Sequence, residues 1–118
     1  MMTVMPVDRK AVTREILLGF WKSHILHHAA EGPVVGQWMI RELRHHGYEV
    51  SPGTMYPLLA RMERNGWLRS STQARGPKAR REYRLTPEGA RVLHLVRRQL
   101  GELHREVLHD RRPRKKNA

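Results

Sequence analysis

The strongest constraint on the fold is a pair of helix-start signals that divide the chain into short segments. In each signal a hydroxyl residue, which favours the N-cap, directly precedes a proline at the first helical position, where its missing amide hydrogen is not needed. The two signals are Ser51-Pro52 and Thr86-Pro87. We therefore expect one helix over residues 52–65, ended by the glycine that follows, and a last helix over residues 87–108.

Hydrophobic periodicity and turn residues place the other segments. Apolar residues at helical spacing predict a first helix over 13–30, with Thr13 as its N-cap, and a second helix over 35–46. Two short segments with strand character, 67–72 and 80–85, are joined by a Gly-Pro-Lys turn, which predicts a β-hairpin.

The order of these elements is helix, helix, helix, hairpin, helix, which is the order of a winged helix-turn-helix domain. The expected fold class is mainly α with a small β-hairpin: a winged helix-turn-helix plus a long C-terminal dimerisation helix. Weak periodicity near the N-terminus and a basic run at the C-terminus indicate unstructured ends. The expected parts are a flexible arm at 1–12, the winged helix-turn-helix DNA-binding domain at 13–86, the dimerisation helix at 87–109 and a disordered basic tail at 110–118.

Composition bears on the partner and on the cellular compartment. The 118 residues carry a formal net charge of +12, which favours a polyanionic partner because each cation that meets a phosphate releases a condensed counterion. The absence of cysteine excludes disulfides, thiolate metal sites and cysteine nucleophiles. No apolar run approaches the roughly 20 residues of a spanning helix. The start of the chain lacks a signal-peptide pattern, so we expect a cytoplasmic protein with no membrane partner.

The helix over 52–65 has one apolar face and one face suited to DNA. The apolar residues recur at i, i+3, i+4 and i+7, which fixes the buried side. They are Met55, Leu58, Leu59 and Met62. The other side carries small residues that permit close approach to a groove, hydroxyls that can bond phosphate or base edges, and arginines that can contact guanine. The candidate DNA contacts are Ser51, Gly53, Thr54, Tyr56, Pro57, Arg61 and Arg64.

An amphipathic helix with a solvated basic face is the alternative for this segment, and the predicted hairpin helps to decide between the two. The hairpin adds candidate phosphate contacts at Lys78, Arg80 and Arg81. Arg69 and Arg84 lie nearby, with only Glu82 opposing them. A cationic hairpin beside a recognition helix can straddle a phosphate backbone or enter the minor groove, so one winged-helix arrangement accounts for both surfaces. A charged edge strand that is simply solvated is the alternative for the hairpin.

A long motif in this region resembles the recognition-helix signature of PadR-type regulators. The motif consists of Ser51-Pro52-Gly53-Thr54-Met55-Tyr56-Pro57-Leu58-Leu59, Arg61-Met62-Glu63 and Gly66-Trp67-Leu68. The flanking segments 47–50 and 83–89 also resemble the family, and the similarity covers roughly residues 16–108. The resemblance implies a dimeric bacterial regulator, in most cases a repressor, that releases its operator when an effector binds. It also implies that Thr54, Tyr56 and Pro57 lie against DNA.

The last helix carries an apolar seam that favours a homodimer. Its residues are spaced three and four apart, as in a heptad repeat. They are Leu93, Val96, Leu100, Leu103 and Val107. A helix over 87–109 is about 34 Å long, more than a small winged helix can cover, so its distal half needs a second copy of the chain. The alternative is that the stripe covers the domain's own core, but short PadR-like proteins also dimerise through this helix and the first one.

The eight histidines are the unusual feature of the composition. On the first predicted helix, His24, His27 and His28 follow i, i+3, i+4 spacing, which can bring imidazoles to one metal ion. Histidines that pack at an interface without metal are the alternative. No cofactor is required by any motif, and the candidate effectors are a small molecule or a divalent metal. The last helix has no aromatic residue, in contrast to PadR-like proteins that stack flat ligands there.

Catalytic motifs are absent from the sequence, so we do not expect an enzyme. There is no His-Glu-x-x-His, no phosphate-binding glycine loop and no Gly-x-Ser-x-Gly. We expect a sequence-specific regulator that binds double-stranded DNA at a palindromic operator as a homodimer and, by resemblance, an effector-responsive repressor. A nonspecific architectural DNA-binding or RNA-binding protein is the alternative, because positive charge alone does not distinguish these classes.

Overall fold

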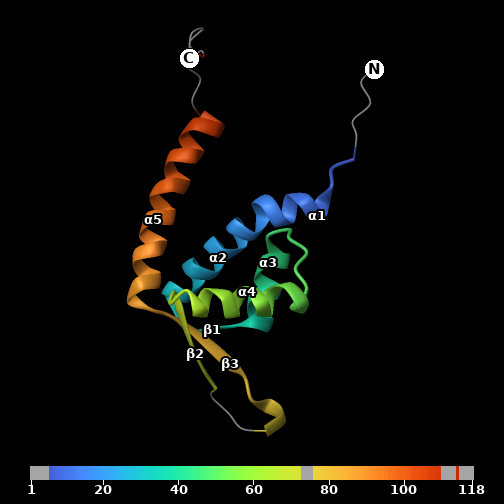
Figure 1. Ribbon diagram of the computed structural model, residues 1–118, viewed down its shortest axis with the longest axis vertical. Coiled ribbons are helices and arrows are strands. Elements are labelled where there is room, and N and C mark those ends of the chain that lie inside the picture. The colour runs from blue at the N-terminus through green and yellow to red at the C-terminus, as the bar shows by residue number, and fades with distance from the viewer. Residues whose placement is uncertain (1–5, 73–75, 110–113, 115–118) are drawn as a thin grey trace.

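The computed structural model describes residues 6–72, 76–109 and 114 and shows helices arranged around a small sheet (Figure 1). The helices are α1 Arg9–Val12, α2 Leu18–Glu31, α3 Gly36–His45, α4 Pro52–Arg64 and α5 Pro87–His104. The π-helical turns η1 Thr13–Leu17 and η3 Arg105–His109 continue α1 and α5, and η2 Gly76–Lys78 is a 3₁₀ turn. The strands are β1 Val34–Val35, β2 Leu68–Thr72 and β3 Arg81–Leu85.

The first helical segment begins earlier than predicted. Asp8 is the N-cap of α1, and its Oδ1 accepts a hydrogen bond from the Ala11 amide at 3.1 Å. Thr13 lies inside the continuous helical segment, so its prediction as the N-cap is wrong. Aspartate ranks above threonine as an N-cap residue, and the Asp8 carboxylate accepts a free amide of the first turn. Residues 9–12, which fall in the predicted arm, are therefore helical.

Helices α3 and α4 form the helix-turn-helix, and glycines end both. Gly47 and Gly66 adopt positive φ angles of 92° and 82°, which glycine tolerates without a steric penalty. The following amides close the helix ends, because Tyr48 N–H donates to the Leu43 carbonyl and Trp67 N–H to the Met62 carbonyl, each at 3.0 Å. The predicted boundaries of the recognition helix α4 are thus confirmed to within one residue.

The start of α4 also follows the prediction, with one difference. Ser51 has the extended backbone of an N-cap, and its carbonyl accepts the Met55 amide at 2.9 Å. Its hydroxyl lies 3.4 Å from Thr54 Oγ1. The proline at the first helical position and the backbone of Ser51 therefore set the start of the helix, while the serine hydroxyl interacts with a side chain on its outer surface.

The sheet has three strands in the order β1-β3-β2, all antiparallel. Strands β2 and β3 form the predicted hairpin, with Leu68 opposite Leu85 and Thr72 opposite Arg81. The third strand, β1, pairs Val34 with Tyr83 and was not predicted, because two residues are too few to show a strand pattern. The hairpin projects away from the helices as the wing (Figure 1), which confirms the winged-helix fold class.

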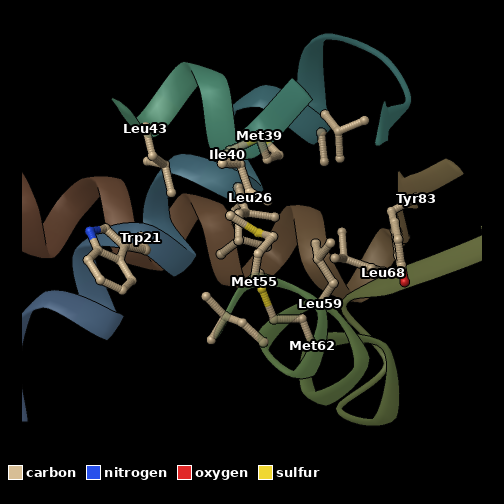
Figure 2. Packing of buried hydrophobic residues seen from close by; sticks show 14 of the residues in the cluster. Trp21, Leu26, Met39, Ile40, Leu43, Met55, Leu59, Met62, Leu68 and Tyr83 are labelled. Carbon is tan, nitrogen blue, oxygen red and sulfur yellow. The ribbon is translucent and has the colours of Figure 1, made fainter. Parts of the chain in front are cut away.

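One hydrophobic core joins the helices to the base of the sheet (Figure 2). The predicted buried face of α4 is confirmed, since all of its members are at most 5% exposed: Met55, Leu58, Leu59 and Met62. Trp21 and Leu26 of α2 and Leu43 of α3 pack into the same core. Tyr83 of β3 closes the core beneath the wing, and burial raises the pKa of its hydroxyl.

The last helix is anchored at its first turn and then leaves the domain. Thr86 Oγ1 accepts a hydrogen bond from the Gly89 amide at 2.9 Å, and the hydroxyl donates to the Gly66 carbonyl. A Cβ atom at Gly89 would lie 2.2 Å from the Trp67 carbonyl oxygen, so glycine is required for this close approach. Leu93 and Val96 in the following turns also pack against the core, and beyond them α5 extends away from the winged domain (Figure 1).

Candidate DNA interface

The outer face of α4 carries the predicted DNA contacts. Because the methionine and leucine face is buried, the opposite side of the helix is directed to solvent. Ser51, Gly53, Tyr56, Pro57, Arg61 and Arg64 are exposed, and Thr54 is half-buried. The surface therefore combines small, hydroxyl and guanidinium groups along one helix, as recognition in a major groove requires.

The Tyr56 ring packs against Gly36, a residue that the sequence analysis did not single out. A Cβ atom at Gly36, in the first turn of α3, would lie 2.5 Å from Tyr56 Cε1. The absence of a side chain at Gly36 therefore lets the tyrosine ring lie directly against the α3 backbone. Tyr56 remains 41% exposed. The only sequence signal for this contact is a glycine in the first turn of a helix. The sequence does not show that Tyr56 of α4 lies against it.

The wing carries arginines that face one another across its strands. Arg80 and Arg81 are exposed, as are Arg69 of β2 and Arg84 of β3. Arg69 is the register partner of Arg84. Like charges directly opposite on a sheet are destabilising unless an anion lies between them, so this pair favours a phosphate contact. Lys78 belongs to the η2 turn, but its side chain lies outside the described residues.

A carboxylate ties the recognition helix to the wing. Glu63 Oε2 accepts hydrogen bonds from the Ser70 amide at 2.9 Å and from the Ser70 hydroxyl at 2.7 Å. These two bonds, with a smaller contribution from Arg81, lower the pKa of Glu63 below its usual value. The contact joins the last turn of α4 to β2, so it fixes the angle between the helix and the hairpin. It was not predicted, because the partners lie on different elements.

One end of the predicted dimer seam on α5 is buried in the chain's own core, and the other end is exposed. Leu93 is 4% exposed and belongs to the chain's own core, and Val96 packs against that core. The first turns of α5 cover the winged domain, so Leu93 is not available to a partner and its assignment to the interface is corrected. Leu100, Leu103 and Val107 lie beyond this contact and are exposed.

The histidines of α2 form a cluster with α3. His24 stacks on His28 with ring centroids 6.4 Å apart, and its ring lies 5.1 Å from that of His46. Burial lowers the pKa of His24, and the neighbouring histidines lower it further. Within the part of the chain that the structure describes, the ligand atoms that come close enough to share one metal ion belong to His27, His28 and Glu31. Glu31 therefore takes the place that the sequence analysis gave to His24.

A helix-turn-helix with a polar outer recognition face, followed by a basic hairpin, defines a winged-helix DNA-binding protein. Comparison with protein families identifies a particular family within this class. Residues 25–95 match the transcriptional regulator PadR-like family. The chain belongs to this family. Among the described residues, none of the helices has the length and apolar character needed to cross a membrane.

Relatives and solved structures agree with the family. The chain is 50% identical over 95 residues to transcriptional regulator Rv3488 of Mycobacterium tuberculosis, which covers 80% of this chain and 89% of the relative. A PadR family transcriptional regulator from Eggerthella lenta is 34% identical with a TM-score of 0.70, covering 83% of this chain and 87% of the other. A PadR-like transcription factor from Bacteroides fragilis is 27% identical with a TM-score of 0.72, covering 84% and 97%. The protein is thus a DNA-binding transcriptional regulator and not an enzyme, as predicted.

Proposed function

We propose that this protein is a sequence-specific repressor that binds a palindromic operator as a homodimer and releases it when an effector binds. The observation that carries the proposal is the outer face of α4, where Tyr56, Arg61 and Arg64 are exposed beside the arginines of the wing. Binding to chromosomal DNA would place the protein in the cytoplasm. The effector class is a small molecule or a divalent metal.

The two surfaces have different tasks in this proposal. Arg61 is exposed in the last turn of α4, where a guanidinium can donate two hydrogen bonds to guanine and so read sequence. Arg80 and Arg81 lie on the wing and bind phosphates, which adds affinity without reading bases. The Glu63 to Ser70 hydrogen bonds hold the two surfaces in a fixed relation.

The homodimer is supported by the apolar residues that the winged domain leaves exposed. Leu100 and Leu103 on α5 are 40% and 48% exposed, and Ile16 and Phe20 on the first helical segment are 54% and 37% exposed. A second copy of the chain that packed on these two elements would remove these apolar side chains from water. A two-fold dimer would cover each of them twice and present two recognition helices to a palindromic site.

The proposal is tested by measuring DNA affinity for matched arginine variants. The operator is first obtained by capturing genomic fragments on the purified protein, and affinity is then measured by fluorescence anisotropy for the operator and for a scrambled duplex at several salt concentrations. Arg61→Ala should weaken operator binding by about 1 to 3 kcal/mol and leave the scrambled duplex unchanged. Arg81→Ala should weaken both duplexes alike and reduce the salt slope by about one.

Arg91→Ala is the matched control, because it removes an exposed arginine that belongs to α5 and pairs with Glu88 of the same helix, rather than one from α4 or the wing. It should change neither affinity by more than a small factor. Equal losses for Arg61→Ala and Arg81→Ala on every sequence would contradict the division of tasks. If the protein bound no genomic fragment better than a scrambled duplex, it would be a nonspecific architectural DNA-binding or RNA-binding protein instead.

A further inference from the structure

The C-terminal end of α2 brings together side chains that can ligate a metal ion. His27, His28 and Glu31 each offer one ligand atom, and these atoms all lie within 4.8 Å of one another. The three residues stand at positions i, i+1 and i+4 at the end of α2, so their backbone spacing is fixed by the helix. None of the three residues belongs to α4, but His28 and Glu31 line the same pocket as Arg80 of the wing.

The separations between the ligand atoms suit a zinc-class ion. Glu31 Oε1 lies 2.9 Å from His28 Nδ1 and 4.0 Å from His27 Nε2. Around a tetrahedral ion with bonds of about 2.0 to 2.1 Å, neighbouring ligand atoms are about 3.3 Å apart. The two observed distances lie on either side of this value, so small side-chain rotations would complete the geometry.

A second carboxylate lies within ion-pair distance of the central imidazole. When His28 binds a metal through Nδ1, its Nε2 carries a proton and can donate it to a hydrogen bond. Glu42 Oε1 of α3 lies 3.8 Å from His28 Nε2 and 3.1 Å from His46 Nε2. The His28 side chain is 14% exposed, so the fold holds the ring in this orientation. A carboxylate behind a ligating histidine is the usual support of a metal site.

We propose that His27, His28 and Glu31 bind a divalent ion of the zinc class, with Glu42 as the positioning residue behind His28. Two imidazole nitrogens and one carboxylate oxygen are a ligand set that zinc accepts, and a fourth position stays open to water or another ligand. Imidazole nitrogen and carboxylate oxygen donors also bind Co²⁺, which gives a visible absorption spectrum in a tetrahedral site. The proposal concerns the protein alone and does not depend on DNA binding.

An arginine competes with the ion for one ligand. Arg97 Nη2 of α5 lies 3.2 Å from His27 Nδ1. If His27 binds the ion through Nε2, its Nδ1 becomes a hydrogen-bond donor and faces the arginine, which is also a donor. Binding therefore requires Arg97 to move away from His27. Removal of the Arg97 guanidinium should therefore strengthen ion binding. If the Arg97 to His27 contact only held the site together, its removal would weaken ion binding instead.

The test is a titration of the full chain with CoCl₂ at neutral pH without DNA, followed by visible absorption and repeated with ZnCl₂ by calorimetry. We expect one ion per chain with micromolar or tighter affinity. His27→Ala and Glu31→Gln should remove the spectrum, whereas Arg97→Met should tighten binding several-fold. Glu42→Gln should weaken binding by about tenfold, since it affects only the support of the ring.

His94→Ala is the matched control, because it removes an exposed histidine from α5 and should leave the titration unchanged. His24→Ala should also retain the spectrum, and circular dichroism should show that every variant is folded. Trp38 provides a second readout, since its ring centroid lies 5.1 Å from that of His28 and Co²⁺ should quench its fluorescence. The proposal is overturned if His27→Ala and Glu31→Gln bind Co²⁺ as the control does, or if the unaltered chain binds none.

Discussion

The double substitution Leu100→Glu with Leu103→Glu should dissociate the proposed dimer without unfolding the winged domain. Both residues lie on the part of α5 that extends beyond the core, and they are 40% and 48% exposed in the single chain. Neither side chain belongs to the core cluster, which ends on this helix with Leu93 and Val96. Their replacement should therefore act on association rather than on the fold.

The expected magnitude follows from the area that a partner would cover. Full burial of a leucine side chain contributes about 1.5 to 3 kcal/mol. Covering the exposed part of both side chains in both copies therefore contributes about 3 to 5 kcal/mol to association. Because 1.4 kcal/mol corresponds to a factor of ten, the dissociation constant should rise by about a hundredfold to a few thousandfold. The buried carboxylates would add a further penalty.

The assay is analytical ultracentrifugation over a range of protein concentrations, together with circular dichroism and operator affinity. Leu95→Glu is the matched control, because Leu95 lies on the same helix, is 54% exposed and is outside the seam. The control should sediment as the unaltered protein does, while the double variant should sediment as a monomer and lose operator affinity by orders of magnitude. A folded double variant that still sediments as a dimer would refute the proposed interface.

Two further predictions concern stability. Gly89→Ala should lower the free energy of unfolding by about 1 to 3 kcal/mol, because the new methyl group would meet the Trp67 carbonyl. Gly101→Ala in the same helix should raise the free energy of unfolding by up to about 1 kcal/mol, because alanine favours a helix more than glycine does. Equal effects of the two substitutions in chemical denaturation would contradict the close approach at Gly89. Glu63→Gln should cost about 1 kcal/mol at neutral pH. Since the folded pKa of Glu63 is lowered, the contribution of its charge is present above the ordinary value of 4.5 and is lost as the pH falls through the folded pKa. Chemical denaturation at decreasing pH should therefore show a larger fall in the free energy of unfolding for the unaltered chain than for Glu63→Gln.

The sequence by itself determined the features that depend on neighbouring residues. Pro52 and Pro87, each preceded by a hydroxyl residue, marked the starts of two helices that the structure confirms. The i, i+3, i+4, i+7 pattern of α4 identified its buried face, and therefore the face that is exposed, without any knowledge of what packs against it. The wing followed from two short segments and a turn. Each of these signals is contained within about two turns of helix or one hairpin.

The tertiary structure decided the features that depend on contacts between distant segments. Strand β1 exists because β3 offers it a free edge, and Leu93 is core rather than interface because the start of α5 packs on the winged domain. Glu63 became a link to the wing only when Ser70 lay beside it. Glu31 joined the histidine cluster because the side-chain orientations of α2 bring it to His27 and His28, while His24 turns toward α3. Periodicity identifies which side of an element is apolar, but the partner that covers that side is chosen by packing over the whole chain.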